Sequence, residues 1–243
     1  MSVLVVIPAR YASTRFPGKP LALMGGKPMV QHVYEGAARA RGVDEVVVAT
    51  DDERIIAAVA RFGGKATMTD PNARSGTDRV AEVARGREAQ VVINVQGDEP
   101  LVQGDMVGQL ADFLTRHPAV PMASLMTPLR NPDDLNNPNV VKVVVDQDGF
   151  ALYFSRSAVP HIHAQGGMRP PLWKHLGLYG YQGHFLLQFP SLMPTPLEQS
   201  EQLEQLRVLE RGYRIKLLET AHDSIGVDTP DDARRVEQLL AKR

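Results

Sequence analysis

The chain has 243 residues, 43% hydrophobic and 23% charged, which is enough for a sizeable core and typical of a globular protein. The formal net charge of -1 argues against nonspecific nucleic-acid binding, and the absence of cysteine excludes disulfides and thiolate metal sites. No apolar run approaches the ~20 residues of a membrane span and no signal-peptide pattern is present, so we expect a cytoplasmic protein that contacts neither nucleic acid nor membrane.

Residues 3–20 (VLVVIPARYASTRFPGKP) predict a buried strand followed by an anion-binding loop. The apolar, mostly β-branched start is typical of a strand covered on both faces. The loop that follows combines small residues with three cations, which favours a polyphosphate ligand. It is not a P-loop, because Ser13 replaces the first glycine of that motif and Pro20 replaces its hydroxyl residue. An ordinary basic surface loop remains the alternative.

Strand and helix patterns then alternate up to about residue 118. Helices are predicted over 28–41, 53–62, 75–84 and 107–114, and strands over 45–50, 65–69 and 91–95. Ser75 begins its helix with a capping-box pattern. This alternation is the pattern of an open, mostly parallel α/β sheet.

The second half does not continue the regular alternation of strand and helix. Short strands are predicted over 122–128, 140–145, 152–154, 176–181 and 215–218, with a turn-rich connector at 131–139 and a loop at 161–171. A helix is expected over 198–210, and a last helix begins at the cap residue Thr229. Without internal repeats or a linker, we interpret this half as a mixed insertion that completes one domain.

Three polar clusters follow predicted strands, namely the 10–19 loop, the segment 74–79 (RSGTDR) and the segment 96–99 (QGDE). Because ligands of open α/β sheets bind beyond the carboxyl ends of the strands, these clusters should share one crevice. A carboxylate such as Asp98 beside polyphosphate-binding cations indicates Mg²⁺, and Asp228 offers a second carboxylate. The alternative is that Asp98 and Glu99 form a helix cap and that Asp228 belongs to the capping segment at Thr229.

A series of longer motifs runs in order along nearly the whole chain: IPARYASTRFPGKPL, VATDD, SGTDR, NVQGDEPL, NPNVVKVV, ALYFSR, KHLGLYGY, LEQLRVLERG and GVDTPDD. Together they resemble the bacterial 3-deoxy-manno-octulosonate (Kdo) cytidylyltransferase family. The resemblance implies a three-layer, mostly parallel Rossmann-like nucleotidyltransferase sheet with a mixed α+β insertion that forms the sugar side and the dimer face. It divides the single domain 1–243 into a CTP-binding half (about 1–118), a sugar-binding and dimerisation portion (about 119–225) and a closing metal-ligand segment with a helix (226–243).

The family transfers CMP from CTP to the anomeric hydroxyl of Kdo, which activates this sugar for lipopolysaccharide biosynthesis, and its members are typically homodimers. The resemblance assigns catalysis to Lys19, Arg10, Arg15 and Asp98, and Mg²⁺ binding to Asp98 and Asp228. It assigns CTP binding to Ala9, Arg10, Ser13, Arg15, Lys19, Arg74, Ser75, Gly76 and Gln96. It assigns sugar binding to Gln96, Arg156, His175, Tyr179, Glu204 and Gln205.

The sugar-binding residues also have structural alternatives. Arg156 fits the cap of a strand, and His175 with Tyr179 fits a packed pair of rings. Glu204 and Gln205 fit a solvated helix face. The apolar residues Leu203, Leu206 and Leu209 fit either a dimer face or the core.

One segment departs from the family pattern. After SRSAVP the family usually carries a tryptophan and a stretch of mixed charge, whereas this chain continues with His161-Ile162-His163 and a loop rich in glycine and proline. We interpret the two histidines as loop residues rather than metal ligands. The departure leaves open an 8-amino Kdo analogue or another acidic sugar such as sialic acid as the substrate. A noncatalytic CTP sensor is the alternative from a different class.

Overall fold

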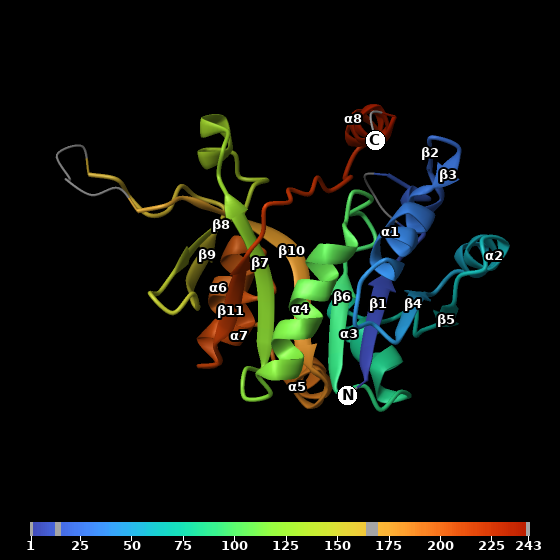
Figure 1. Cartoon of the computed structure of the whole chain (residues 1–243), viewed down its shortest axis with the longest axis horizontal. Helices are drawn as coiled ribbons and strands as arrows, with labels where there is room; N and C mark the ends of the chain where they lie inside the picture. The colour runs from blue at the N-terminus through green and yellow to red at the C-terminus, as the bar shows by residue number, and fades with distance from the viewer. Residues whose placement is uncertain (1, 13–15, 164–169, 242–243) are drawn as a thin grey trace.

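The computed structural model describes residues 2–12, 16–163 and 170–241. In this part of the chain a nine-stranded sheet forms the centre of the molecule, and seven of its strands form a continuous row (Figure 1). In their order across the sheet these are β11 (Ile215–Glu219), β7 (Met122–Pro128), β10 (Trp173–Gln182), β6 (Val91–Val95), β1 (Val3–Pro8), β4 (Glu45–Thr50) and β5 (Ala66–Met68). The strands β1, β4, β5 and β6 are parallel, whereas β10 runs antiparallel to both of its neighbours.

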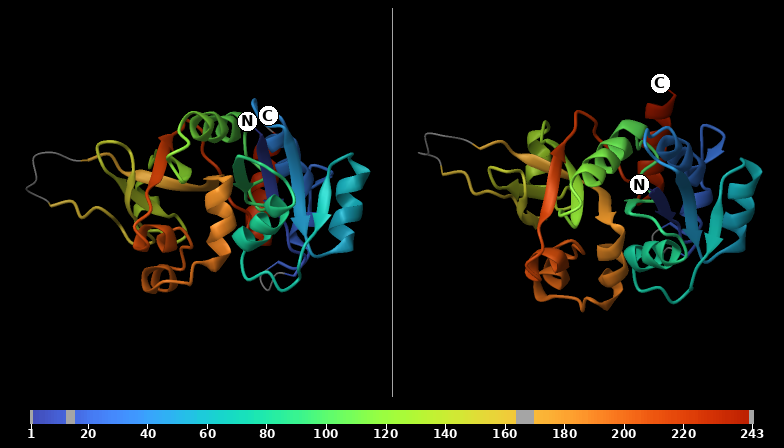
Figure 2. Two further views of the ribbon diagram at one scale, coloured as in Figure 1. Left: turned by 90° about the horizontal axis from the view of Figure 1, so that it is seen from below. Right: turned by 60° about the horizontal axis from the view of Figure 1, so that its bottom comes forward.

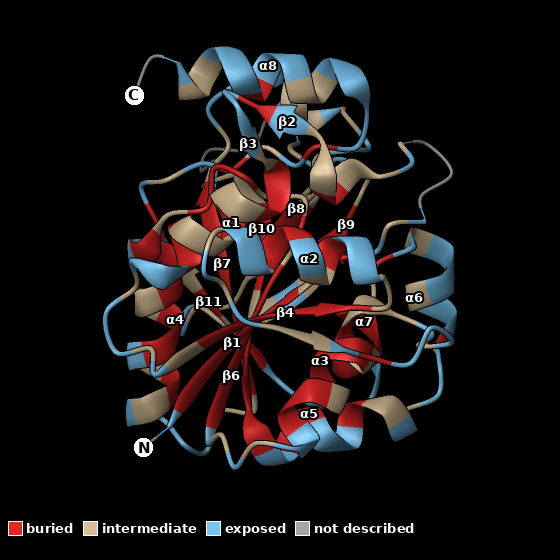
Figure 3. Ribbon diagram, turned by 90° about the vertical axis from the view of Figure 1, so that its right-hand side faces the viewer, coloured by how far each residue is buried: buried red, intermediate tan, exposed pale blue. Residues whose placement is uncertain are grey.

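Two hydrophobic layers cover the sheet, because alternate residues of a strand point to opposite faces. In β1, Val3, Val5 and Ile7 join one layer, and Leu4 and Val6 join the other. The first layer receives α1 (Met29–Ala38), α2 (Glu53–Arg61) and α4 (Gly104–Arg116). The second layer receives α3 (Gly76–Arg85), α5 (Gly183–Gln188) and α7 (Leu206–Glu210). The predicted three-layer α/β fold is therefore confirmed, with the buried strands between the helices (Figure 3).

The insertion is built around the long strand β10. Its first residues pair with β8 (Lys142–Val145), which forms a hairpin with β9 (Ala151–Ser155), and its later residues pair with β6. The strand predicted over 176–181 is therefore longer than expected, because it serves both parts of the sheet. The described parts of the connection from β9 to β10 extend away from the rest of the molecule (Figure 2).

The prediction of a single helix over 198–210 is wrong. The chain forms α6 (Pro196–Glu201), breaks at Gln202 in the left-handed region (φ 53°) and resumes as α7. Leu203 and Leu206 are buried in the second hydrophobic layer, and Leu209 packs against it. These three leucines are core residues, so they give no support to a dimer face.

The last helix, α8 (Pro230–Leu240), begins with the predicted capping box between Thr229 and Asp232. It packs over the two-stranded ribbon of β2 (Leu23–Met24) and β3 (Lys27–Pro28), and Val236 contributes its buried side chain to a third small cluster. The C-terminal segment therefore packs beside the residues that follow the N-terminal loop. In the described chain, no helix is both long and apolar enough to cross a membrane.

Candidate active site

The ends of β1 and β6 approach each other at one edge of the sheet. A Cβ atom on Gly97 would lie 2.4 Å from the carbonyl oxygen of Pro8, so only glycine permits this approach. The amide of Val227 donates to the carbonyl of Asp98 at 2.9 Å and ties the segment before α8 to the same place. Residues from the start, middle and end of the chain thus meet beyond the strand ends.

Lys19 lies at this meeting point, in the short 3-10 helix η1 (Lys19–Leu21). Its ammonium donates to Asp98 Oδ2 at 2.9 Å, to the carbonyl of Val227 at 2.7 Å and to Asp228 Oδ1 at 3.4 Å. The structure therefore brings together the predicted catalytic lysine and both predicted metal ligands.

The two carboxylates fit a divalent cation. Asp98 and Asp228 face the same positive group, and their side chains are 35% and 51% exposed, which leaves room for ligands from solution. Among the described residues, no group of three or more His, Asp or Glu side chains forms a ready-made metal site. A pair of carboxylates that needs phosphate oxygens and water to complete the coordination is the arrangement that Mg²⁺ prefers.

The N-terminal loop closes on itself before it reaches Lys19. The amide of Gly18, in the left-handed region (φ 71°), donates to the carbonyl of Tyr11 at 2.9 Å. Ala9 is buried, and Arg10 is exposed and available to a ligand. The predicted phosphate-binding residues Ser13 and Arg15 lie outside the described residues.

The predicted nucleotide segment 74–76 lies beside the end of β1, because a Cβ on Gly76 would be 3.6 Å from the Pro8 ring. The hydroxyl of Ser75 caps α3 by accepting from the Asp78 amide. The guanidinium of Arg74 donates to Asp78 Oδ2 at 3.0 Å and also to a carbonyl of the 189–191 turn. The segment is thus fixed by its own helix cap at the same strand edge as Lys19.

Glu204 contacts the start of α3, and its charge also acts on the phenol of Tyr179. Its carboxylate accepts from the hydroxyl of Thr77 in the first turn of α3. Burial raises the pKa of Glu204, against the opposing effect of hydrogen bonds from Thr77 and Ser75. The solvated helix face considered for Glu204 and Gln205 is not what the structure has, because Gln205 is only 4% exposed.

A polar pocket of about 570 Å³ lies next to Asp228, between β10, the 134–141 connector and the segment that leads into α8. His175, Tyr179 and Gln205 line it, as expected of sugar-binding residues. Sequence reasoning missed several other polar residues that line this pocket, namely Glu99, Asn137, Asn139, Lys174, Asp223, Ser224 and Arg235.

His175 and Tyr179 enter this pocket as neutral groups. His175 Nε2 lies 2.8 Å from the hydroxyl of Ser124, which donates to the carbonyl of Leu178 at 2.8 Å, so the imidazole donates to that hydroxyl. Burial lowers the pKa of His175 to about 3, and burial also raises the pKa of the Tyr179 phenol. The two side chains therefore offer hydrogen bonds and no charge near neutral pH.

Gln96 and Arg156 are absent from the pocket lining. The amide of Gln96 donates to Asn94 Oδ1 at 3.2 Å, and its Cγ lies 3.9 Å from where a Cβ on Gly177 of β10 would be. The guanidinium of Arg156 binds main-chain carbonyls, with Nε to Glu201 at 2.8 Å and Nη1 to Pro138 at 2.9 Å. Arg156 thus joins the connector to the end of α6.

Glu99 was predicted only as part of a possible helix cap. Its carboxylate accepts from the hydroxyl of Ser224, and burial raises its pKa to about 7 against the opposing effect of that hydrogen bond. The signal in the sequence was its place directly after Asp98. Its partner lies 125 positions away and could not be deduced from a local pattern.

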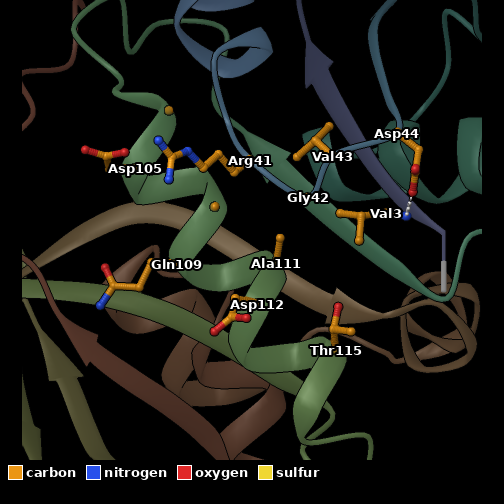
Figure 4. Close-up of a pocket in the computed structure, with 12 residues that line it drawn as sticks. Val3, Arg41, Gly42, Val43, Asp44, Asp105, Gln109, Ala111, Asp112 and Thr115 are labelled. Atoms are coloured by element: carbon orange, nitrogen blue, oxygen red, sulfur yellow. Dashed lines mark hydrogen bonds between the residues drawn. The ribbon is translucent and has the colours of Figure 1, made fainter.

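A larger cavity of about 730 Å³ lies along α4, beside the loop that precedes β4 (Figure 4). Arg41, Asp105 and Asp112 are among the residues that line it, and Asp44 is bonded to the Val3 amide. None of the predicted site residues lines this cavity. The functional site is therefore assigned to the polar pocket beside Lys19.

The chain is similar to known proteins over nearly its whole length. A family model described as Cytidylyltransferase matches residues 4–216. A protein of Geobacter sulfurreducens named 3-deoxy-manno-octulosonate cytidylyltransferase is 52% identical, with 99% of this chain and 100% of that protein covered. A protein of Geotalea uraniireducens with the same name is also 52% identical, with both chains fully covered.

Solved structures give the same result. A CMP:2-keto-3-deoxy-manno-octonic acid synthetase complexed with CTP is 44% identical and superposes with a TM-score of 0.94, covering 100% of this chain and 99% of that one. A cytidylyltransferase from Leptospira borgpetersenii is 15% identical, with a TM-score of 0.68 over 100% of this chain and 88% of that one, and shows a shared fold alone.

Proposed function

The chain belongs to the cytidylyltransferase family, and from this membership we propose that it transfers CMP from CTP to the anomeric hydroxyl of Kdo, releasing pyrophosphate. The observation that carries the proposal is the meeting of Lys19, Asp98 and Asp228 beside a polar pocket lined by both charged and neutral hydrogen-bonding groups. The names of relatives about half identical to this chain favour Kdo over the 8-amino analogue or sialic acid. The product would be an activated sugar for lipopolysaccharide synthesis.

The reaction needs positioning and charge neutralisation more than covalent work by the protein. We assign the triphosphate to the loop that ends at Lys19, with Arg10 and Arg15 as further cations and with Ala9 and Ser13 beside them. We assign the cytidine to the segment Arg74–Ser75–Gly76 and to Gln96. Lys19 would stabilise negative charge on the α-phosphate and on the departing pyrophosphate.

We propose that Asp98 and Asp228 hold Mg²⁺ together with the triphosphate. Bound there, the ion would supply a positive charge that polarises the α-phosphate and favours deprotonation of the attacking hydroxyl. The sugar would be oriented by hydrogen bonds from four side chains, namely Gln96, His175, Tyr179 and Gln205. The resemblance also assigns Arg156 and Glu204 to the sugar. They would act indirectly, by fixing the connector, the end of α6 and the start of α3 around the site.

We also propose the assembly that the resemblance implies. The chain would act as one domain with a CTP-binding half (about 1–118), a sugar-binding and dimerisation portion (about 119–225) and a closing segment (226–243). The described residues next to β9 and β10 that extend away from the rest of the molecule would contact the second copy (Figure 2). Light scattering during size-exclusion chromatography would test the homodimer, and cell fractionation would test a cytoplasmic location.

The decisive experiment is pyrophosphate release with CTP, Mg²⁺ and Kdo. Release that requires the sugar is expected, and a rate equal to the blank without Kdo would exclude the proposed reaction. A panel with the 8-amino analogue and sialic acid tests the choice of sugar. Asp98→Asn should retain the fold by circular dichroism and lose nearly all turnover. Tight CTP binding without turnover on any sugar would instead favour a nucleotide sensor.

A further inference from the structure

The carboxylates that line the polar pocket would repel the carboxylate of an acidic sugar. Apart from Glu99, which burial favours in its protonated form, and Asp228, which faces Lys19, the described lining residues of the pocket include three carboxylates and two cations; the carboxylates are Asp134, Asp223 and Asp232. An acceptor that carries its own carboxylate would meet like charges on several sides. A cation inside the pocket has to compensate that charge, since an unpaired anion is costly to enclose.

Two candidates for this role do not supply the charge. Arg156, the expected cation, is engaged through Nε, Nη1 and Nη2 with three main-chain carbonyls, at 2.8, 2.9 and 3.3 Å, and does not line the pocket. His175 is buried and neutral, because its pKa is lowered to about 3. The cations that do line the pocket in the described chain are Lys174 and Arg235.

Lys174 is the better placed of the two. It lies on the central strand β10, next to His175, and its side chain is only 17% exposed. Arg235 is an exposed residue of α8 at the rim of the molecule. A charge interaction is stronger where solvent is partly excluded. The partly buried Lys174 should therefore bind an anion more strongly than the exposed Arg235.

The present partner of Lys174 can be replaced. Its ammonium donates to Asp223 Oδ1 at 2.7 Å and to the carbonyl of Ser224 at 3.3 Å. The side chain of Asp223 is 59% exposed, so water can take over its solvation when another carboxylate binds. The ammonium is therefore held in place by a main-chain carbonyl and balanced by an exchangeable carboxylate.

We propose that Lys174 binds the carboxylate of the acceptor sugar, which replaces Asp223 as its partner and makes the enzyme selective for 2-keto-3-deoxy sugar acids over neutral sugars. This inference rests on the proposed function. Lys174 is then a specificity-determining residue. It contacts the substrate at a group that takes no part in the bond changes.

The test compares Kdo with its neutral carboxamide in the full-length enzyme. Wild type should prefer the acid, and Lys174→Met should lose about 10- to 100-fold in kcat/KM for Kdo, mainly through KM, while losing little for the amide. The KM for CTP should stay unchanged, and Lys174→Arg should restore part of the preference. Lys65→Met is the matched control, because Lys65 is an exposed lysine paired with Glu45 at 3.1 Å and remote from the pocket.

The outcomes separate this inference from the function on which it rests. If wild type transfers CMP to Kdo and Lys174→Met keeps the preference for the acid, the inference is wrong and the function stands. The inference is also wrong if Arg235→Met, and not Lys174→Met, removes the preference. If wild type uses neither sugar, the proposed function fails and this inference with it. Loss of discrimination confined to Lys174→Met supports the proposal.

Discussion

Replacing Glu99 with glutamine should remove a pH dependence of folding stability that the burial of this carboxylate creates. Glu99 accepts from Ser224 beside the pocket, and burial raises its pKa from 4.5 to about 7. The amide of glutamine keeps an oxygen that can accept from Ser224 and has nearly the same shape. The substitution therefore removes the charge of the carboxylate and leaves the packing and the hydrogen bond in place.

The sign and size of the effect follow from the two pKa values. Between pH 4.5 and about 7 the folded chain holds a proton at Glu99 that the unfolded chain has lost, so this contribution to stability is complete at low pH and disappears as the pH rises. At 1.36 kcal/mol per pKa unit the whole effect is about 3 kcal/mol. Between pH 5 and pH 8 it amounts to about 2–3 kcal/mol.

The assay is urea unfolding of wild type and Glu99→Gln at several pH values from 5 to 8, with EDTA present. All other titrating groups are common to both proteins, including His175, whose lowered pKa acts in the opposite direction. The stability of the variant relative to wild type should rise by about 2–3 kcal/mol across this range. A constant difference would refute the reasoning. Glu88→Gln, at an exposed residue, controls for the loss of one negative charge.

Three further substitutions test the packing that positions the site. Gly97→Ala places a Cβ 2.4 Å from the Pro8 carbonyl, so it should destabilise the fold by about 1–3 kcal/mol and lower kcat at least tenfold. Gly183→Ala, with a Cβ 2.1 Å from the Ala89 carbonyl and far from the site, should destabilise the fold similarly and leave kcat unchanged. Lys142→Met leaves three partly buried main-chain carbonyls without their ammonium donor, and urea unfolding should show a loss of about 1–3 kcal/mol.

The sequence predicted the central strands closely because their signal is local. β4, β6 and β7 have the predicted bounds, since a short, mostly apolar run between turn residues is recognisable within a few positions. The six-residue helix α5 was missed, because so short an element has little periodicity. The break at Gln202 was missed because glutamine does not signal a left-handed conformation.

The candidate site also has residues that a local pattern predicted and residues that it did not. Asp98 was predicted from the strand that precedes it, and Asp228 from the cap residue that follows it. The roles of Arg156 and Lys174 depend on partners 18 to 50 positions away, which no short pattern records. The charged residues in the motifs therefore indicated that a site exists. Only the three-dimensional structure showed whether each of these side chains faces the pocket or binds the main chain.

The contacts of Lys19 explain how the site remains folded before substrates arrive. Two carboxylates that face the same point would repel each other, and the ammonium between them removes most of that repulsion. Together the three groups carry one net negative charge, so they attract a divalent cation only weakly by themselves. In the proposed reaction a polyphosphate would change this balance, because it would offer Lys19 a new anionic partner and add oxygen ligands for the metal. Under that proposal the metal would bind together with the nucleotide rather than beforehand to the free enzyme.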